Sequence, residues 1–238
     1  MNIALIPARG GSKRIPRKNI KLFKGKPLLS YAINAAKTAD LFDDIIVSTD
    51  DAEIAEISSR CGASVPFMRP QELADDYTGT MAVVAHAAEE LMRQKKIIDF
   101  ICCIYPTTPL LLANSIQTGF TQLVNNPTLD YVFGVCEFDY PIQRGLTLAG
   151  NGKLKMLFPE HVSTRSQDFP VAFHDAGQFY WGRVKAFLNA EPMFGEKSLP
   201  LFLPRERAVD IDTQEDWRIA EVFHDVLHLQ SAESADDP

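Results

Sequence analysis

A cluster of basic side chains follows directly on the first apolar segment of the chain. Residues 5–19 read LIPARGGSKRIPRKN, which places two glycines among arginines and lysines. Glycine lets backbone N–H groups approach an oxyanion closely, and Arg and Lys neutralise its charge. The spacing is neither that of a Walker A loop, GxxxxGK[ST], nor that of a GxGxxG loop. We therefore expect this segment to bind a small polyanion through a loop of its own type.

The charge distribution favours an anion site over a merely solvated basic loop. Residues 1–39 contain no acidic side chain, the first acid being Asp40, although the whole chain carries a net charge of -7. So many cations on one short loop would repel each other without an anion. An acidic protein with a single basic segment is also a poor candidate for a general nucleic-acid binder, so we expect no nucleic-acid partner.

Two carboxylates near the C-terminus form a second candidate site. In VDIDTQED, residues 209–216, Asp210 and Asp212 lie two positions apart, and on an extended strand such residues share a face. Paired carboxylates suit a Mg²⁺ ion that is bound together with substrate phosphates. The alternative is helix capping by Thr213 and Asp216. We expect this capping as well, but it leaves the first two aspartates unexplained, so we also expect a metal pair.

Three weaker signals lie at or near predicted strands. The segments 48–51 (STDD) and 105–109 (YPTTP) each follow an apolar run, and open α/β sheets bind ligands at the carboxyl ends of their strands. The alternatives are a helix N-cap for the first segment and a rigid turn for the second. His174 beside Asp175 lacks the further ligands of a metal site, so we expect this histidine to be packed or to face a substrate.

Short apolar runs alternate with helical patterns over the first part of the chain. The apolar runs are continuous, as is typical of strands in a parallel sheet. Such alternation predicts an α/β fold with a mainly parallel, Rossmann-like nucleotide-binding sheet and helices on both faces. The expected strands are 2–6, 45–48, 100–105 and 131–136, and the expected helices are 27–38, 51–60, 80–92 and 114–125.

The alternation stops after about residue 137. Asn151-Gly152 between apolar flanks predicts a hairpin over 146–158 with a type I′ turn. A hairpin alone is marginally stable, so we expect the small inserted segment 138–175 to pack against a partner. The remaining expectations are extended segments at 178–181, 199–203 and 208–211, a helix over 213–229 and a disordered acidic tail over 230–238, so that residues 1–229 form one α/β domain.

The composition is that of an ordinary globular chain of 238 residues, with 46% hydrophobic and 23% charged residues. It excludes disorder, collagen and coiled coil as descriptions of the whole. No apolar run approaches the roughly 18 residues of a membrane span, and the first residues lack the basic region of a signal peptide. The cysteines show no CxxC spacing, so we expect reduced thiols in a cytoplasmic protein with no membrane partner.

Several motifs, taken in order, resemble those of the CMP-sialic acid synthetase family, the cytidylyltransferases of nonulosonic acids. They are residues 5–19, IVSTDD at 46–51, RPQELADD at 69–76, YPTTP at 105–109 and DIDTQEDW at 210–217, and the resemblance spans about residues 3–220. The first motif is highly specific, and the others are persuasive together. YPTTP stands where the family typically has QPTSP. FHDAGQFYWG at 173–182 resembles the pseudaminic acid branch of the family.

The resemblance implies transfer of CMP from CTP to the anomeric hydroxyl of a nine-carbon sugar acid, with release of pyrophosphate, by a homodimer that uses Mg²⁺. Tyr105 in place of the family's Gln favours pseudaminic acid as the sugar. The alternatives are N-acetylneuraminic acid and, more distantly, 3-deoxy-manno-octulosonic acid. The segment 138–175 then serves dimerisation or the sugar site. Asp76 matches an acidic position of the third motif and receives no role.

The site residues that the resemblance implies fall into three groups, which lie near the strand ends and in the inserted segment. The nucleotide contacts are Arg9, Gly10, Gly11, Ser12, Lys13, Lys18, Asn19, Ser48 and Arg69. The catalytic groups are Arg9, Lys18, Asp210 and Asp212, and the two aspartates are also the metal ligands. The sugar contacts are Tyr105, Arg165, Gln167, His174 and Gln178, with Arg165 facing the sugar carboxylate.

Two hypotheses of other kinds stay open. A non-catalytic nucleotide-binding sensor could use the same basic loop, but it would have no need of the pair Asp210 and Asp212. A nucleotidyltransferase for sugar 1-phosphates would need extra basic groups in its sugar half, where residues 100–182 offer few.

Overall fold

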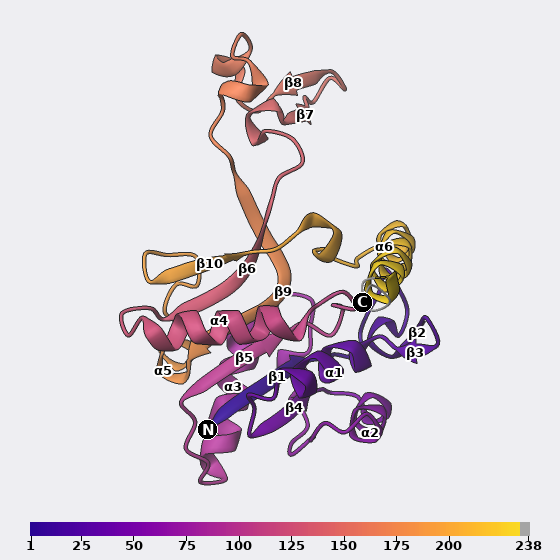
Figure 1. The fold of residues 1–238 in the computed structure, drawn as a ribbon, viewed down its shortest axis with the longest axis vertical. Helices are drawn as coiled ribbons and strands as arrows, with labels where there is room; N and C mark the ends of the chain where they lie inside the picture. The colour runs from indigo at the N-terminus through magenta and orange to yellow at the C-terminus, as the bar shows by residue number, and fades with distance from the viewer. Residues whose placement is uncertain (234–238) are drawn as a thin grey trace.

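A six-stranded mixed sheet forms the centre of the molecule (Figure 1). The computed structural model describes residues 1–233. The sheet strands are β1 (Asn2–Pro7), β4 (Asp44–Ser48), β5 (Phe100–Ile104), β6 (Tyr131–Glu137), β9 (Phe173–Arg183) and β10 (Ser198–Phe202). Their order is β10-β6-β9-β5-β1-β4. The expected α/β fold with a mainly parallel sheet is confirmed.

One strand runs against the others at the middle of the sheet. β9 is antiparallel to both β5 and β6, whereas β4, β1 and β5 pair in parallel and β10 pairs in parallel with β6. The pairing of β9 with β6 is interrupted by a bulge, since Phe133 lies opposite Tyr180 but Val135 lies opposite Asp175. Residues 176–179 therefore lie opposite the single residue Gly134 of β6, while Phe179 still pairs with Ile104 at the carboxyl end of β5.

Helices cover both faces of the sheet. α1 (Leu29–Ala39) and α4 (Ala113–Asn125) pack on one face, and α3 (Thr80–Arg93) and α5 (Val184–Leu188) pack on the other. Alternate residues of β1 serve the two cores: Ala4 and Ile6 face the first pair of helices, and Ile3 and Leu5 face the second. Burial on both faces explains why the strands are continuous apolar runs.

Shorter elements complete the body and include one departure from expectation. β2 (Leu22–Phe23) pairs with β3 (Lys26–Pro27), so Pro27 lies in a strand and not at the first position of a helix. α2 (Ala52–Arg60) starts at Asp51, whose side chain accepts the N–H of Ile54 as an N-cap. The remaining single turns are η1 (Lys18–Ile20), η2 (Gln71–Leu73) and η6 (Arg205–Arg207).

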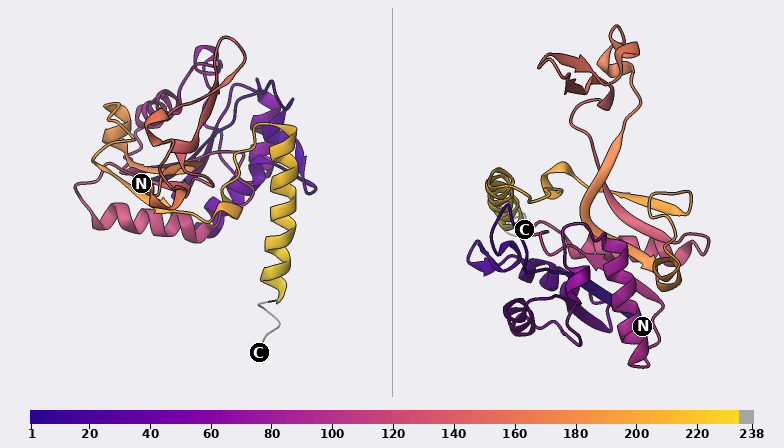
Figure 2. Two further views of the ribbon diagram at one scale, coloured as in Figure 1. Left: turned by 90° about the horizontal axis from the view of Figure 1, so that it is seen from above. Right: turned by 180° about the vertical axis from the view of Figure 1, so that it is seen from behind.

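The C-terminal helix α6 (Gln214–Glu233) starts where the sequence predicts. The Asp216 carboxylate accepts the N–H of Thr213 (2.7 Å), and the Thr213 hydroxyl accepts the N–H of Asp216 (3.2 Å), which is the expected reciprocal cap. The helix packs through Trp217 and His224 on Phe23, and its C-terminal end runs off the body (Figure 2). The expected tail 230–238 is helical up to Glu233, and the rest of it lies outside the described residues. Neither α6 nor any other helix within residues 1–233 is long and apolar enough to cross a membrane.

Residues 138–172 form an arm that stands out from the body (Figure 1). Glu137 of β6 pairs directly with Phe173 of β9, so the chain leaves the sheet and returns to it at neighbouring positions. The arm contains the expected hairpin, together with three single turns. These elements are η3 (Ile142–Arg144), β7 (Leu146–Leu148), β8 (Leu154–Met156), η4 (Pro159–His161) and η5 (Ser166–Asp168).

The turn of that hairpin differs from the expected type I′. The N–H of Ala149 donates to Lys153 (2.8 Å), and Gly152 alone in the loop has a positive φ, of 75°. A type I′ turn requires positive φ at both central residues, so this loop is a three-residue connection with a type I turn and a glycine bulge. Asn151-Gly152 therefore predicts the hairpin correctly but not its turn.

Candidate active site

A cleft of about 240 Å³ lies outside the carboxyl ends of β1 and β5. This is where open α/β sheets bind ligands. Its walls come from the loop after β1, the start of α3, the segment after β5 and the segment before α6. Its polar lining consists of Arg9, Ser12, Lys13, Arg14, Lys18, Asn19, Arg69, Thr78, Thr80, Tyr105, Thr107 and Asp212.

A second, larger cavity of about 710 Å³ lies between α1, the loop 109–113 and α6. Lys24, Lys26, Lys37 and Arg207 contribute to its lining, but none of the site residues predicted from the sequence does. We therefore place the chemistry in the smaller cleft, where the motif residues meet.

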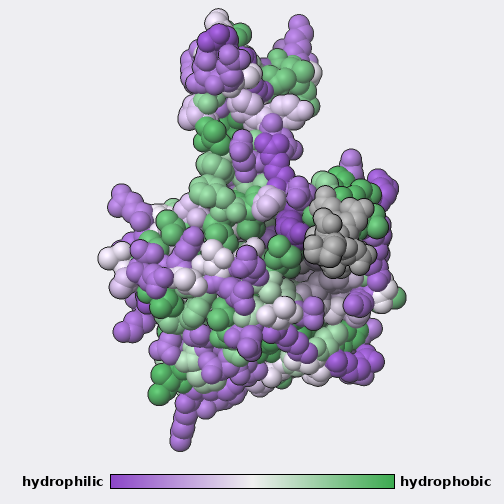
Figure 3. Space-filling view, viewed as in Figure 1, coloured by the Kyte–Doolittle hydropathy of each residue, from purple (hydrophilic) through white to green (hydrophobic). Residues whose placement is uncertain are grey.

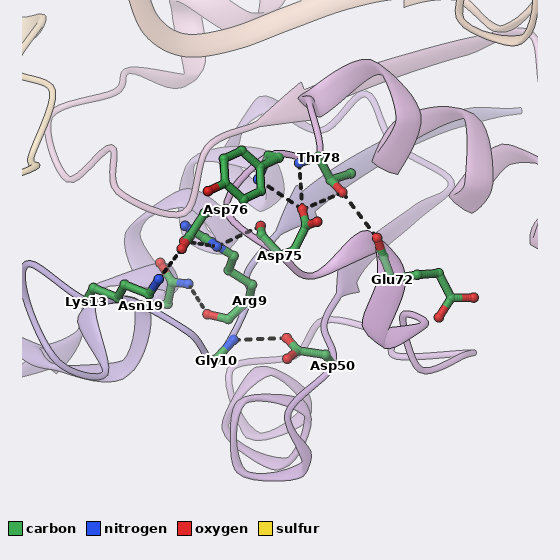
Figure 4. A network of polar contacts seen from close by, with 10 residues as sticks. Arg9, Gly10, Lys13, Asn19, Asp50, Glu72, Asp75, Asp76 and Thr78 are labelled. Atoms are coloured by element: carbon green, nitrogen blue, oxygen red, sulfur yellow. Dashed lines mark hydrogen bonds and ion pairs between the residues drawn. The ribbon is translucent and has the colours of Figure 1, made fainter.

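The Asp76 carboxylate bridges two cations of the basic loop (Figure 4). The Arg9 guanidinium donates to one of its oxygens (2.7 Å), and the Lys13 ammonium contacts the other. Hydrogen bonds from Lys13, which has the larger effect, and from Arg9 hold the pKa of Asp76 below its usual range. The repulsion expected among the loop cations is therefore relieved here by a carboxylate of the same chain.

Asp212 neutralises two further cations of the loop. It accepts Arg14 (2.8 Å) and the largely buried Lys18 ammonium (3.2 Å), which also donates to the Ile211 carbonyl (2.5 Å). Asp210 lies nearby and has no ion pair or hydrogen bond from any side chain within residues 1–233. Desolvation, followed by the charge of Asp212, raises its pKa. The two carboxylates are thus neighbours, as expected, although residues 208–211 form no strand.

The base of the loop is tied to the start of α2. Arg17, in the left-handed region with φ of 56°, contacts Asp51 and Glu53. The hydrogen bond from Arg17 lowers the pKa of Asp51 to about 2. The N–H of Gly10 donates to Asp50 (2.9 Å), and a Cβ at Gly10 would meet the Asp51 carboxylate at 2.8 Å. Glycine is thus needed at position 10 for close approach to a carboxylate of the protein itself.

The remaining glycine-loop residues have mixed placements. Gly11 has open space around it and does not line the cleft. Asn19 is buried and donates to the Arg9 carbonyl (2.9 Å), so it fixes the loop as well as lining the cleft. Ser12 lines the cleft as expected.

Arg69 is a buried cation at the edge of the cleft. Only 6% of it is exposed, and its guanidinium donates to the hydroxyl (3.1 Å) and the carbonyl of Ser48. Burial lowers its pKa to about 10, so it stays protonated at neutral pH. No carboxylate within residues 1–233 forms an ion pair with it. Ser48 itself is fully buried, and it reaches the cleft only through its hydrogen bonds with Arg69.

Tyr105 belongs to a chain of hydroxyl groups beside the cleft. Its phenol shares a hydrogen bond with Thr80 (2.7 Å), and its ring lies against Tyr180 at a centroid distance of 5.2 Å. Tyr180 in turn donates to Asp175 (2.6 Å). Burial raises the pKa of both tyrosines, so both stay neutral at neutral pH. Tyr105 is the one expected sugar contact that lines the cleft.

The other expected sugar contacts lie elsewhere in this chain. Gln178 is buried, and its side-chain amide donates to the Arg207 carbonyl. Its backbone carbonyl accepts the N–H of Tyr105 (2.8 Å), so Gln178 stabilises the bulge of β9. His174 packs on the ring of Phe138 at the base of the arm.

Arg165 and Gln167 sit on the arm, away from the cleft (Figure 1). Arg165 pairs there with Asp168 (2.9 Å). The structure therefore does not bring these two residues to the cleft of the same chain. The reason is that residues 138–172 extend outward and do not fold back over the sheet.

Some cleft residues were not among the expected contacts. Arg14 pairs with Asp212, and Thr78 and Thr80 contribute hydroxyl groups. Arg14 lies inside the basic motif and could have been included on that ground. The two threonines follow the motif RPQELADD, whose role near the cleft is visible only in the fold.

Comparison with known proteins agrees with this geometry. Residues 3–223 match the family model described as cytidylyltransferase. The chain is 44% identical to a pseudaminic acid cytidylyltransferase of Campylobacter jejuni, over 95% of this chain and 97% of the relative. It is 32% identical to N-acylneuraminate cytidylyltransferase A of Danio rerio, over 92% of this chain and 49% of that longer relative.

Solved structures support the fold. A CMP:2-keto-3-deoxy-manno-octonic acid synthetase complexed with CTP superimposes with a TM-score of 0.67 at 15% identity, covering 97% of this chain and 99% of that chain. A 4-diphosphocytidyl-2C-methyl-D-erythritol synthase of Anaerococcus prevotii gives a TM-score of 0.62 at 13% identity, covering 94% and 98%. At such low identities these likenesses concern the fold alone.

Proposed function

The chain belongs to the cytidylyltransferase family, and from this premise we propose that it transfers CMP from CTP to the anomeric hydroxyl of pseudaminic acid, releasing pyrophosphate. The observation that carries the sugar is the 44% identity to a pseudaminic acid cytidylyltransferase over nearly the full length of both chains. The cleft supports it with a cationic loop on one side and an aromatic hydroxyl cluster on the other.

The cations of the loop are suited to a triphosphate. Arg9, Lys13 and Lys18 line the cleft within one short segment, and each already contacts an oxygen anion of the protein. Nucleotide phosphates would take over these contacts. Arg69 is different, because it is buried and lacks an ionic partner within the described residues. We assign it to a carbonyl oxygen of the base, because it lines the cleft as a buried cationic donor.

Asp210 and Asp212 are suited to a divalent cation. The desolvation that raises the pKa of Asp210 is the situation that a bound cation relieves. No group of three or more potential metal ligands occurs within the described residues. The pair therefore fits a cation that takes its other ligands from substrate phosphates, as Mg²⁺ does. When bound, Mg²⁺ would supply Lewis-acid stabilisation of the phosphate oxygens.

The reaction is a substitution at the α-phosphate. The anomeric oxygen forms the new bond to phosphorus as the bond to pyrophosphate breaks, and the hydroxyl proton is lost. Charge develops on the phosphate oxygens, so fixed cations contribute by position and electrostatics. Arg9 and Lys18 are held in place before substrate arrives, by Asp75 and Asp76 and by Ile211 and Asp212 respectively.

Tyr105 is our candidate for the choice of sugar. Its ring packs on Tyr180, and its hydroxyl is engaged by Thr80, so it presents a rigid, mostly apolar surface to the cleft. Pseudaminic acid carries a methyl group at C9, where N-acetylneuraminic acid has a hydroxyl. An apolar wall rejects an added hydroxyl by roughly a hundredfold at most, so we expect slow use of N-acetylneuraminic acid.

We propose a homodimer built through the arm. The arm exposes four leucines by more than half, namely Leu146, Leu148, Leu154 and Leu157. Further apolar side chains follow along the narrow part that joins the arm to the body (Figure 3). Exposed apolar groups on so extended a segment are typical of an interaction surface. Arg165 and Gln167 could meet a sugar only if a second copy brings its cleft to the arm.

We also infer a cytoplasmic location. The four cysteines are free thiols, and three of them are buried. Burial raises the pKa of Cys103 to about 12, so this thiol is inert. Free cysteines are typical of a reducing compartment.

A pyrophosphate-release assay tests the function. Each of the four nucleoside triphosphates is combined with pseudaminic acid, N-acetylneuraminic acid or 3-deoxy-manno-octulosonic acid. We expect turnover with CTP and pseudaminic acid to exceed every other combination. Equal rates with ATP, GTP or UTP would contradict the nucleotide assignment. Binding of CTP with no release of pyrophosphate in the presence of any of the sugars would instead indicate a nucleotide sensor.

A further inference from the structure

Asp76 occupies the position where an anionic ligand would be expected. Its two carboxylate oxygens contact Arg9 and Lys13, and both of these cations line the cleft (Figure 4). About a third of the Asp76 side chain is exposed, so the carboxylate can leave without breaking a packed core. The free protein thus holds an anion of its own at the cations that the proposed function assigns to phosphate.

The neighbouring residue fixes the turn that presents Asp76. One oxygen of the Asp75 carboxylate accepts the N–H groups of Tyr77 (2.9 Å) and Thr78 (2.7 Å) and the Thr78 hydroxyl (2.7 Å). The Asp75 carbonyl accepts a hydrogen bond from Arg9 (2.7 Å). The turn is therefore built by Asp75 and does not depend on the side-chain contacts of Asp76.

We propose that Asp76 is an internal anion that every phosphate ligand must displace from Arg9 and Lys13, so that it lowers the affinity of the cleft for all of them. The inference rests on the proposed function. A ligand with few charges gains little by displacing a carboxylate from two cations, so phosphate and pyrophosphate bind poorly. A nucleoside triphosphate combines several charges with contacts elsewhere in the cleft, such as Arg69, and therefore displaces Asp76.

The test is direct binding, measured by calorimetry with pyrophosphate and with CTP. Asp76→Asn removes the competing charge. We expect this variant to bind pyrophosphate about three- to tenfold more tightly than wild type, which corresponds to the summed free energy of two exposed ion pairs. CTP affinity rises by a similar factor. The gain shrinks in high salt, because exposed charges are screened.

Asp75→Asn is the matched control. It removes one negative charge from the same turn, yet its amide oxygen can keep the backbone hydrogen bonds. Its side chain does not touch Arg9 or Lys13, so pyrophosphate affinity should stay within about twofold of wild type. Asp76→Asn is also introduced into Lys13→Gln. The gain in pyrophosphate affinity relative to Lys13→Gln alone should be smaller than the gain that Asp76→Asn gives in wild type, because one of the two ion pairs is already absent.

The possible outcomes separate this inference from the proposed function. Equal tightening by Asp75→Asn and Asp76→Asn would reduce the effect to net charge and overturn the inference. Unchanged or weaker pyrophosphate binding by Asp76→Asn would overturn it as well. If wild type binds pyrophosphate but not CTP, the proposed function fails, while the pyrophosphate comparison still decides the role of Asp76.

Discussion

The two halves of the proposed cleft are built in different ways. The nucleotide half, formed by residues 8–19, Arg69 and the aspartates 210 and 212, lies within one chain, and its loop cations already contact carboxylates. In the sugar half, Tyr105 lines the cleft, whereas Arg165 and Gln167 stand on the arm. We therefore expect nucleotide binding to need only this chain, whereas we expect full sugar recognition to depend on a partner at the arm.

The largest effect is expected from Asp210 and Asp212, the proposed metal ligands, which we place between the two halves. Asp212→Asn should lower kcat by about 10²–10³ because it removes a charged group at the reacting centre. Pyrophosphate release measures the loss, and circular dichroism verifies the fold. Glu215→Gln, an exposed change in the first turn of α6, should leave kcat unchanged. Full wild-type activity in excess chelator would show that the pair has no metal role.

Removing the arm separates the halves most directly. An Asn-Gly turn that joins Glu137 to Phe173 closes the ladder where these residues already pair. We expect a monomer by light scattering, CTP affinity within about twofold of wild type and turnover lowered by about 10², since sugar positioning is lost. A dimer that persists without the arm would reject the proposed interface.

Tyr105 tests the sugar half on a finer scale. Tyr105→Gln should lower the preference for pseudaminic acid over N-acetylneuraminic acid about tenfold in kcat/KM, since an amide can bond an added hydroxyl. Tyr105→Phe keeps the ring and loses the hydrogen bond to Thr80, so the preference should change less. An identical preference in all three proteins would remove Tyr105 from sugar choice.

The smallest effect concerns the stability of the nucleotide half. Arg17 lowers the pKa of Asp51 in the folded protein to about 2, from 3.8. The stabilisation is therefore complete above the unfolded pKa and is lost as the pH falls towards about 2. Asp51→Asn should cost about 1–2 kcal/mol at pH 7, allowing for the exposure of Arg17. Thermal melts should differ by a few degrees at pH 7 and converge near pH 2; a constant difference would contradict the linkage.

What could be predicted from the sequence is mostly local. The strands of the parallel part are recognisable as apolar runs. The basic residues that suit an anion are all found in one segment, residues 5–19. The pairing of Arg9 with Asp76, or of Arg14 with Asp212, could not be predicted, because it joins loops that meet only once the sheet has formed.

The antiparallel direction of β9 left no local signal either. A buried strand reads alike in both directions, and its expected core at 178–181 gives no hint of the bulge beside it. The predicted sugar contacts differ most from the observed placements. Gln178 stabilises that bulge, and Arg165 lies on the arm, away from the cleft.

The place of β9 in the sheet also bears on how the chain must fold as it is made. β9 lies between β5 and β6, but the ribosome delivers it after both and after the whole arm. At about 5–20 residues per second, β5 and β6 wait for several seconds with facing edges unpaired. Open edges of this kind can pair with other chains. The nascent protein is therefore most exposed to pairing with other chains while the arm is emerging. β5 and β6 become joined only when residues 173–183 arrive.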